Sequence, residues 1–170
     1  MDFFETVERR HTTRLYEENE LNEMALLKIL ETANLAPSAR NLQSYEIYVI
    51  KDPLKKKILL EGSSGRQEAA KAGALLLFLA NPTKGNNEEE KETSKSFAIQ
   101  DAVIAAAYAQ LAATALGLDS GWVAYINKDS LKKLGIPDTL LPVALIPIGT
   151  GSEEVFTRKR RTLDDIIHRI

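Results

Sequence analysis

The sequence of 170 residues contains no cysteine, and its two histidines, His11 and His168, lie near opposite ends of the chain. Without cysteine there can be no disulfide framework, thiolate nucleophile, cysteinyl zinc site or iron–sulfur cluster. Because the histidines are so far apart in sequence, we also expect no metal site. The absence of cysteine fits a reducing compartment, so we expect a cytoplasmic protein.

The chain also lacks a strong charge of one sign and an uninterrupted apolar run. Its net charge is −2, so no global basic field predicts binding to nucleic acid or to an anionic membrane. Asp2 and Glu5 stand where a secretory signal would carry basic residues. Gln100, Asp101 and Gln110 interrupt the longest apolar stretch, and we therefore expect no membrane span.

Common nucleotide-binding and hydrolase motifs are absent as well. Gly149-Thr150-Gly151-Ser152 has no third glycine that would open a helix, so a Rossmann or P-loop site is unsupported. Gly62-Ser63-Ser64-Gly65 lacks the serine spacing of a nucleophile elbow, and no nearby histidine completes a triad. Since nothing pairs a general base with a nucleophile, a cofactor would have to carry any chemistry.

Length and the pattern of apolar residues predict one domain of mixed α and β structure that spans residues 1–170 and has no internal repeats. Ala74–Leu79 is a continuous apolar run of strand length, so it should be a central strand that is buried on both faces. The other expected strands and the expected helices follow from periodicity and from turn residues. The strands are Tyr45–Ile50, Ala74–Leu79, Trp122–Ile126 and Val143–Ile148, and the helices are Asp2–Arg10, Asn22–Leu35, Leu54–Leu60, Gln67–Lys71 and Phe97–Leu116.

The alanine-rich helix Phe97–Leu116 carries apolar and small residues nearly all the way round, and Gly117 is placed to end it. A single chain of this size has little material to surround such a helix, so we expect a second subunit to cover part of it. The alternative is a central helix wrapped by its own chain. Leu163–Ile170 reads as an amphipathic tail, and the polar stretch Pro82–Lys95 is the best candidate for a lid.

The run Arg9-Arg10-His11-Thr12-Thr13-Arg14 offers three guanidiniums and two hydroxyls within six residues. Guanidiniums match phosphate oxygens with paired hydrogen bonds, and threonine hydroxyls can fill the remaining acceptor positions. The run therefore suits a phosphate monoester. On its own it could equally be the solvated basic end of a short helix.

Two further clusters point the same way. The loop Pro37-Ser38-Ala39-Arg40-Asn41-Leu42-Gln43 gathers a hydroxyl, a guanidinium and two amides that could bond the edge of a planar heterocycle, although it could also be a plain polar turn. Arg158-Lys159-Arg160-Arg161 places four cations after the last strand, where an anion or the carboxylates of Glu153 and Glu154 could offset their repulsion. Together the clusters suggest a phosphate-bearing aromatic ligand.

These motifs, in this order, resemble the FMN-dependent nitroreductases. The resemblance covers almost the whole chain. It rests on the Arg9–Arg14 run, Ala36-Pro37-Ser38-Ala39-Arg40-Asn41-Leu42-Gln43, the alanine-rich helix closed by Leu116-Gly117-Leu118, Trp122, Ile148-Gly149 and Arg158–Leu163. It implies an α+β, nitroreductase-like three-layer fold, with a central, mostly antiparallel sheet flanked by helices. It further implies an intertwined homodimer that binds FMN at each of two subunit interfaces.

The resemblance also implies roles for individual residues. Arg10 and Thr12 would hold the FMN phosphate together with Arg158 and Arg160, although the choice among Arg158, Arg160 and Arg161 stays open. His11 would support the ribityl and phosphate region, and Arg14 would lie toward the pyrimidine side of the ring. The partner subunit would contribute Pro37, Ser38, Ala39 and Asn41 to the ring. Within Gly121–Tyr125, the Ala124 N–H would point toward flavin N5. Arg9 and Thr13 would be solvent-facing or structural.

The implied activity is transfer of hydride from NAD(P)H, through the flavin, to an electrophile such as a nitroaromatic or a quinone, in two alternating half-reactions. Two departures bear on loop shape: Gln43-Ser44-Tyr45 stands where many members have Gln-Pro-Trp, and Gly151 stands where a proline is common. The chain also lacks the longer central excursion of many members. The alternatives are a non-catalytic flavin- or nucleotide-binding dimer, and a dehalogenating or flavin-fragmenting enzyme on the same scaffold.

Overall fold

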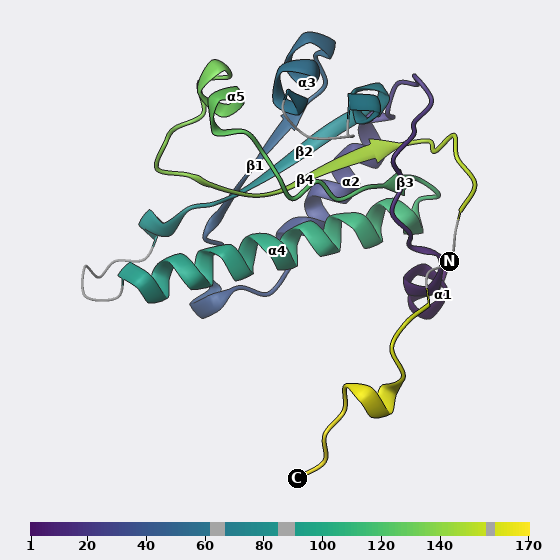
Figure 1. Cartoon of the computed structure of the whole chain (residues 1–170), viewed down its shortest axis with the longest axis vertical. Helices are drawn as coiled ribbons and strands as arrows, with labels where there is room; N and C mark the ends of the chain where they lie inside the picture. The colour runs from purple at the N-terminus through teal and green to yellow at the C-terminus, as the bar shows by residue number, and fades with distance from the viewer. Residues whose placement is uncertain (62–66, 85–90, 156–158) are drawn as a thin grey trace.

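A computed structural model describes residues 1–61, 67–84, 91–155 and 159–170 of the chain. Four strands form one antiparallel sheet, whose order is β1-β2-β4-β3. The strands are β1 (Tyr45–Ile50), β2 (Ala74–Ala80), β3 (Asp119–Ser120) and β4 (Leu141–Gly149). Figure 1 shows this sheet between helices on either side.

Strand β2 lies inside the sheet, between β1 and β4, and every one of its residues is buried. Its side chains alternate between two apolar cores: Leu76 and Phe78 pack into one, and Leu75, Leu77 and Leu79 into the other. This alternation follows from the two-residue period of a strand. The prediction of a central strand buried on both faces is confirmed.

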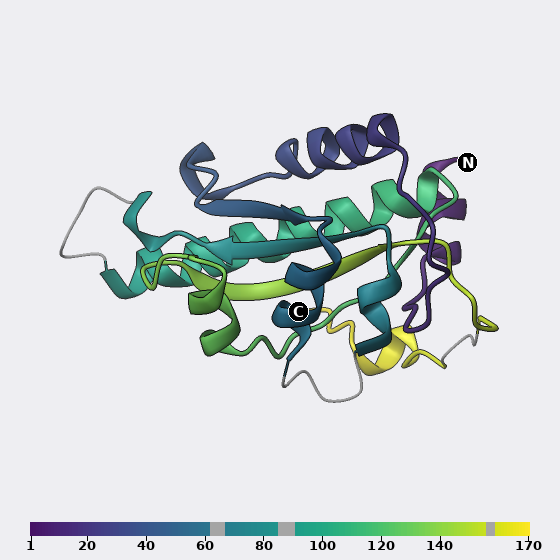
Figure 2. The ribbon, with the colours of Figure 1, turned by 90° about the horizontal axis from the view of Figure 1, so that it is seen from above.

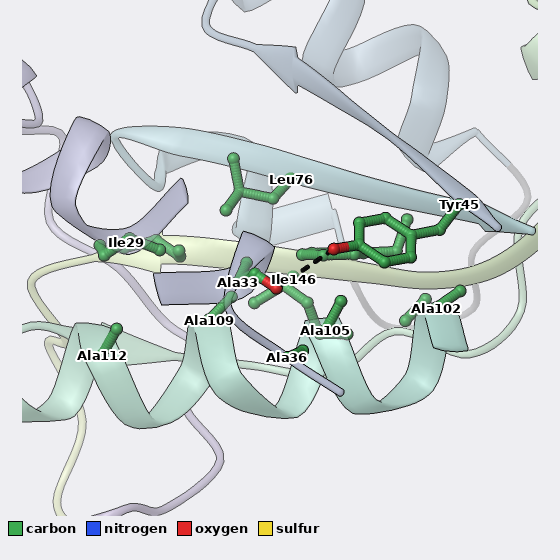
Figure 3. Packing of buried hydrophobic residues seen from close by; sticks show 14 of the residues in the cluster. Ile29, Ala33, Ala36, Tyr45, Leu76, Ala102, Ala105, Ala109, Ala112 and Ile146 are labelled. Carbon is green, nitrogen blue, oxygen red and sulfur yellow. Dashed lines mark hydrogen bonds between the residues drawn. The ribbon is translucent and has the colours of Figure 1, made fainter. Parts of the chain in front are cut away.

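Helices cover both faces of the sheet, which confirms the three-layer α+β fold. One core joins the sheet to α2 (Glu23–Asn34) and α4 (Lys91–Ala115), and the other joins it to α3 (Pro53–Leu60) and α5 (Lys128–Lys133). Figure 2 shows the two helix layers on opposite sides of the strands. In Figure 3, alanines of α4 face Ile29 and Ala33 of α2 and Leu76 of β2. These small side chains let the helix approach closely.

Capping residues explain where several helices begin. The side chain of Asn22 accepts hydrogen bonds from the N–H groups of Met24 (2.9 Å) and Ala25 (3.1 Å) at the start of α2. Asp52 accepts from the Lys55 N–H at 2.9 Å, and Pro53 occupies the first position of α3, where no N–H is needed. Asp2 caps α1 (Phe3–Arg9) in the same way.

One strand prediction is wrong. Trp122–Ile126 is not a strand: β3 covers Asp119–Ser120, and beyond it only Val123 forms a bridge, to Leu145. The reason lies in β4, where Pro147 accepts a hydrogen bond from Gly121 at 3.2 Å but has no N–H with which to return one. The ladder is therefore interrupted beside Gly121, and the chain leaves the sheet after Val123.

Other boundaries also differ from expectation. Helix α4 begins at Lys91, six residues before the expected Phe97, and Pro82–Lys84 forms a short 3₁₀ helix, η3. Residues 85–90 of the expected lid and the expected turn Gly62–Gly65 lie outside the described residues. Gln67–Lys71 is helical, as a 3₁₀ helix, η2.

Within one chain, α4 is covered on only one side. Its other side leaves Phe97, Ile99, Val103 and Tyr108 between 36% and 39% exposed. The C-terminal tail, in which Leu163–Asp165 forms a 3₁₀ helix, η5, extends away from the body (Figure 1) with its isoleucines exposed. The described part of the chain therefore does not wrap its central helix completely.

By length and composition alone, Ser94–Ala115 within α4 is long and apolar enough to cross a membrane, although its polar interruptions led us to expect no such helix. Half of that stretch is buried in the chain. Of the three residues that interrupt the apolar run, Asp101 and Gln110 are buried and hydrogen-bonded, whereas Gln100 is exposed. This is the environment of a core helix that packs on a sheet.

Candidate cofactor-binding site

A cavity of about 1080 Å³ lies where α1, the C-terminal end of α4 and the segment after β4 meet. Figure 1 shows these three segments converging near the N-terminus. The cavity is lined by Met1, Val7, Glu8, Arg9, Arg10, His11, Thr12, Arg14, Thr114, Gly117, Leu118, Asp119, Glu153, Glu154, Val155 and Arg160. The fold thus brings residues from the basic run near the N-terminus together with a cation near the C-terminus.

The two ends of the chain each contribute one guanidinium to this cavity. Arg10 is half-buried, and its pKa is lowered, first by burial and second by the positive charge of Arg160. Two cations held side by side without a bound anion repel each other, and a phosphate between them would replace that repulsion with charge-assisted hydrogen bonds. The pair is therefore suited to an anionic group.

His11 is fixed by both nitrogens of its ring. Its Nδ1 lies 3.0 Å from the Arg9 carbonyl oxygen, and its Nε2 lies 3.2 Å from Asp119 Oδ1. The other carboxylate oxygen of Asp119 accepts a hydrogen bond from the Gly151 N–H at 2.7 Å. Asp119 thus ties the basic run to the segment that follows β4.

Glu153 makes a second tie between the same two segments. Its Oε1 accepts hydrogen bonds from the backbone N–H groups of Arg14 and Leu15, the latter at 3.3 Å. The sequence left open whether an anion or the carboxylates of Glu153 and Glu154 offset the cations Arg158–Arg161; in the structure Glu153 bonds the backbone of the basic run. Glu153 also lines the cavity, together with Arg160.

The cations of the C-terminal run differ in their surroundings. Arg160 lines the cavity, whereas Arg161 donates a hydrogen bond to the Asp165 carbonyl in the tail. Arg158 lies outside the described residues. Of the two arginines that the structure describes in this run, Arg160 is the one placed to bind an anion beside Arg10.

Within the basic run, Thr12 and Arg14 are exposed and line the cavity. Thr13 is 2% exposed, and its hydroxyl has no hydrogen-bond partner in the described ranges. Its backbone N–H donates to the Ser120 carbonyl at 3.0 Å. Arg9 is exposed and forms an ion pair with Glu5 at 3.4 Å, although it also contributes to the cavity wall.

Gly121 allows the basic run to pass close to the segment after β3. A Cβ at this position would lie 2.5 Å from the Thr13 carbonyl oxygen, a distance that no side chain tolerates. The Gly121 carbonyl accepts a hydrogen bond from buried Gln110 at 3.2 Å. Three residues later, Ala124 is exposed, and among the described residues its N–H has no hydrogen-bond acceptor. That N–H is free to bond a ligand.

The loop between α2 and β1 has a strained backbone without any glycine. Arg40, Asn41 and Gln43 have φ angles of 52°, 57° and 43°, in the left-handed region. The loop includes the 3₁₀ helix η1 (Ala39–Asn41) and packs against α4, where the Asp101 carboxylate accepts from the N–H groups of Ala39 (2.9 Å) and Ser44 (3.2 Å).

This loop is remote from the cavity of its own chain. Asp101, which holds the loop, and Thr114, which lines the cavity, are thirteen positions apart on α4. At a rise of 1.5 Å per residue they are separated by about 20 Å along the helix axis. One subunit therefore does not bring Pro37, Ser38, Ala39 and Asn41 to the residues that surround Arg10.

The sequence and the fold were compared with known proteins. The model of the nitroreductase family matches residues 7–78 and 56–150, which together cover most of the chain. The chain belongs to the nitroreductase family. A protein of Thermus thermophilus named NADH dehydrogenase is 26% identical over 94% of this chain and 91% of its own length.

Solved structures of other proteins share the fold of this nitroreductase-family chain. NfrA2 of B. megaterium aligns with a TM-score of 0.91 and 23% identity, over 99% of this chain and 74% of its own. A structure from Exiguobacterium sibiricum in complex with FMN has a TM-score of 0.88 and 22% identity, over 100% of this chain and 98% of its own. At these identities the likeness establishes the three-layer fold.

Sequence analysis missed several residues that hold the cavity walls and the α2–β1 loop in place. Asp101 and Gln110 were noted only as interruptions of an apolar run, and Asp119 was not singled out. Asp101 and Gln110 share one signal, a polar residue within an otherwise apolar helix. No group of three or more potential metal-binding side chains occurs within the residues that the structure describes.

Proposed function

We propose that this nitroreductase-family chain is an FMN-dependent oxidoreductase that takes hydride from NAD(P)H and passes it to a small electrophile such as a nitroaromatic or a quinone. We further propose that it works as a homodimer in the cytoplasm. The observation that carries the proposal is the pairing of Arg10 with Arg160 in one cavity. The FMN found in the structure from Exiguobacterium sibiricum, and the NADH in the name of the protein from Thermus thermophilus, support the choice of cofactor and reductant.

The residues of the cavity fit FMN. A phosphate monoester carries up to two negative charges, which would be matched by the guanidiniums of Arg10 and Arg160 and by the exposed hydroxyl of Thr12. The cavity volume of about 1080 Å³ lies at the upper end of the range for small-molecule sites and leaves room for a ring system beyond the phosphate. Arg14 supplies a further cation on the same wall.

Bound FMN would supply hydride transfer at its N5 atom, alternately accepting from the nicotinamide and donating to the acceptor. The chain itself would bind and orient. His11, held by Arg9 and Asp119, would be a rigid part of the wall near the phosphate and ribityl chain. The N–H of Ala124, for which no acceptor is found among the described residues, would donate a hydrogen bond toward N5. Arg14 would stabilise negative charge on the pyrimidine side of the ring.

A second subunit would complete the site. The loop that contains Ser38 and Asn41 lies too far along α4 to reach the cavity of its own chain. The exposed apolar side chains on α4, such as Val103 and Tyr108, provide a surface that a second copy would cover. In that arrangement the loop of each subunit would lie over the ring bound beside the other subunit's Arg10, and it would exclude water there.

The test begins with the purified protein as isolated. We expect flavin absorbance, release of FMN on denaturation, and oxidation of NADH or NADPH that depends on a quinone or a nitroaromatic. Separate titrations with NADH and NADPH would establish the preferred reductant. A colourless protein that gains no FMN on incubation and oxidises neither nucleotide would overturn the proposal and leave the non-catalytic binding dimer as the function.

A further inference from the structure

Asp101 is a carboxylate in an unusual place. It lies in the apolar helix α4 and is 2% exposed. In the described ranges no lysine, arginine or histidine forms an ion pair with it, and its two oxygens are used by two backbone N–H groups, from Ala39 and Ser44. A buried carboxylate without a cation is costly, so its retention in the core calls for a specific use.

The two N–H groups that Asp101 binds bracket the strained part of the α2–β1 loop. Between Ala39 and Ser44 lie Arg40, Asn41 and Gln43, all in the left-handed region. Left-handed backbone is unfavourable for residues that carry a Cβ, and it persists only where the surroundings impose it. Asp101 fixes the loop at both ends of this stretch, with one oxygen at 2.9 Å and the other at 3.2 Å.

Other contacts within the loop are local and polar. The Ser38 hydroxyl accepts a hydrogen bond from the Gln43 N–H at 3.1 Å, and the Gln43 side chain donates to the Asn41 carbonyl. These bonds close the loop on itself but do not attach it to the body of the protein. The Asp101 carboxylate anchors the loop backbone to α4, and at the end of the loop the Asn81 N–H also donates to the Ser44 carbonyl at 2.9 Å.

We propose that Asp101 is a positioning residue that presets the conformation of the Ser38–Gln43 loop before the loop meets the flavin bound by the other subunit. The inference rests on the proposed function for its consequence, because the loop contacts flavin only if FMN is the ligand. Asp101 itself lies in the core and touches neither flavin nor substrate. Its effect is to remove the entropic cost of ordering the loop when the cofactor binds.

The variant that separates this role from general stability is Asp101→Asn. It keeps the volume and one acceptor oxygen, but it presents an NH₂ group to one of the two backbone N–H groups, so one end of the loop is released. We expect amide hydrogen exchange at Ala39 or Ser44 to accelerate at least tenfold in the FMN-free protein. We expect FMN affinity to fall about tenfold to a hundredfold, the usual effect of one lost hydrogen bond to a charged group.

A second variant provides a matched control. Lys56 is also a buried charged residue, 7% exposed, whose Nζ donates to the Ala72 carbonyl at 2.7 Å, but it lies in α3 on the opposite face of the sheet. Lys56→Met should lower the free energy of unfolding, while FMN affinity and loop exchange remain as in the wild type. In flavin-loaded enzyme, Asp101→Asn should change KM for the acceptor or kcat, whereas Lys56→Met should change neither.

The outcomes are distinct. Faster loop exchange with weaker FMN binding in Asp101→Asn, and neither in Lys56→Met, supports the positioning role. Unchanged exchange at Ala39 and Ser44, or equal loss of FMN affinity in both variants, overturns it. If the wild type binds no FMN at all, the proposed function fails, and the exchange measurement on the FMN-free protein still decides whether Asp101 orders the loop.

Discussion

Arg160, from the C-terminal part of the chain, lines the same cavity as Arg10, and the pKa of the Arg10 guanidinium is lowered first by burial and second by the charge of Arg160. Neither arginine is neutralised by an ion pair in the described part of the chain. The arrangement costs folding free energy in the empty protein and returns it when an anion binds. It is the feature that most directly separates a cofactor site from a solvated basic patch.

Replacing Arg10 tests this pairing. In Arg10→Ala we expect FMN to bind about 10- to 100-fold more weakly, because a charge-assisted contact of about 1.5–3 kcal/mol is lost. In the absence of FMN, urea unfolding should show no loss of stability, since the repulsion by Arg160 is relieved. The double variant Arg10→Ala with Arg160→Ala should release FMN and leave a folded dimer.

Arg161→Ala is the control, because the Arg161 side chain donates a hydrogen bond to the Asp165 carbonyl in the tail. If Arg161→Ala lowered FMN affinity as much as Arg10→Ala does, the assignment of the phosphate to Arg10 and Arg160 would be refuted.

The tie made by Asp119 has its own test. Asp119→Ala removes the partner of His11 Nε2 and of the Gly151 N–H, and we expect the free energy of unfolding to fall by about 1–3 kcal/mol. FMN affinity should fall too, because the His11 ring loses its orientation. Urea unfolding and flavin titration measure the two effects. The exposed carboxylate of Asp138 offers the comparison: Asp138→Ala should change stability by about 0.5 kcal/mol or less.

Gly121 tests the close approach of two backbone segments. Gly121→Ala places a Cβ 2.5 Å from the Thr13 carbonyl oxygen, so the basic run must shift, and we expect about 2–4 kcal/mol of destabilisation together with weaker FMN binding. Gly135→Ala is the control, because a Cβ at Gly135 would meet no other atom within 4 Å. We expect it to lower the free energy of unfolding by about 1 kcal/mol, because Gly135 has a φ of 72°, which alanine adopts less readily than glycine. Equal losses of stability in urea would show that the segments do not constrain each other.

A mixed dimer tests whether the two halves of the site come from different subunits. Asn41→Ala impairs the loop, since alanine tolerates the φ of 57° less well than asparagine, and Arg10→Ala impairs the phosphate end. If the loop acts across the interface, a dimer with one chain of each kind has one intact site and binds one FMN with wild-type affinity. Both parent homodimers should bind weakly. A mixed dimer without any tight site would place both halves in one subunit.

Tyr45 gives a prediction for alkaline pH. Its side chain is buried, its hydroxyl donates to the Ala33 carbonyl at 3.4 Å (Figure 3), and burial, followed by the charge of Asp101, raises its pKa above the ordinary 10.0. The folded state therefore keeps the phenol proton where the unfolded chain releases it, and this contribution to stability is lost as the pH rises above 10. In Tyr45→Phe, the fall in unfolding free energy above this pH should be smaller. An identical fall in both proteins would contradict the predicted shift.

Local physical rules were sufficient to predict most elements from the sequence. The apolar run of β2 predicted an interior strand, and Asn22 and Pro53 predicted the starts of α2 and α3, because capping and periodicity depend on neighbouring residues. The strand expected at Trp122–Ile126 failed for a non-local reason. Just before it, Gly121 lies opposite Pro147, which has no N–H to continue the ladder, and within the segment only Val123 forms a bridge, to Leu145.

For the site, the sequence by itself determined the chemical inventory: guanidiniums and hydroxyls in the basic run, amides in the Pro37 loop, and no cysteine. Only the tertiary structure decided how these groups combine. It places Arg160 in the same cavity as Arg10. It also pairs Asp119 with the His11 ring and the Gly151 N–H, and Glu153 with the backbone N–H groups of Arg14 and Leu15. The loop that Asp101 binds lies far from the cavity. Such pairings depend on which segments the sheet and α4 place side by side, and no local pattern encodes that placement.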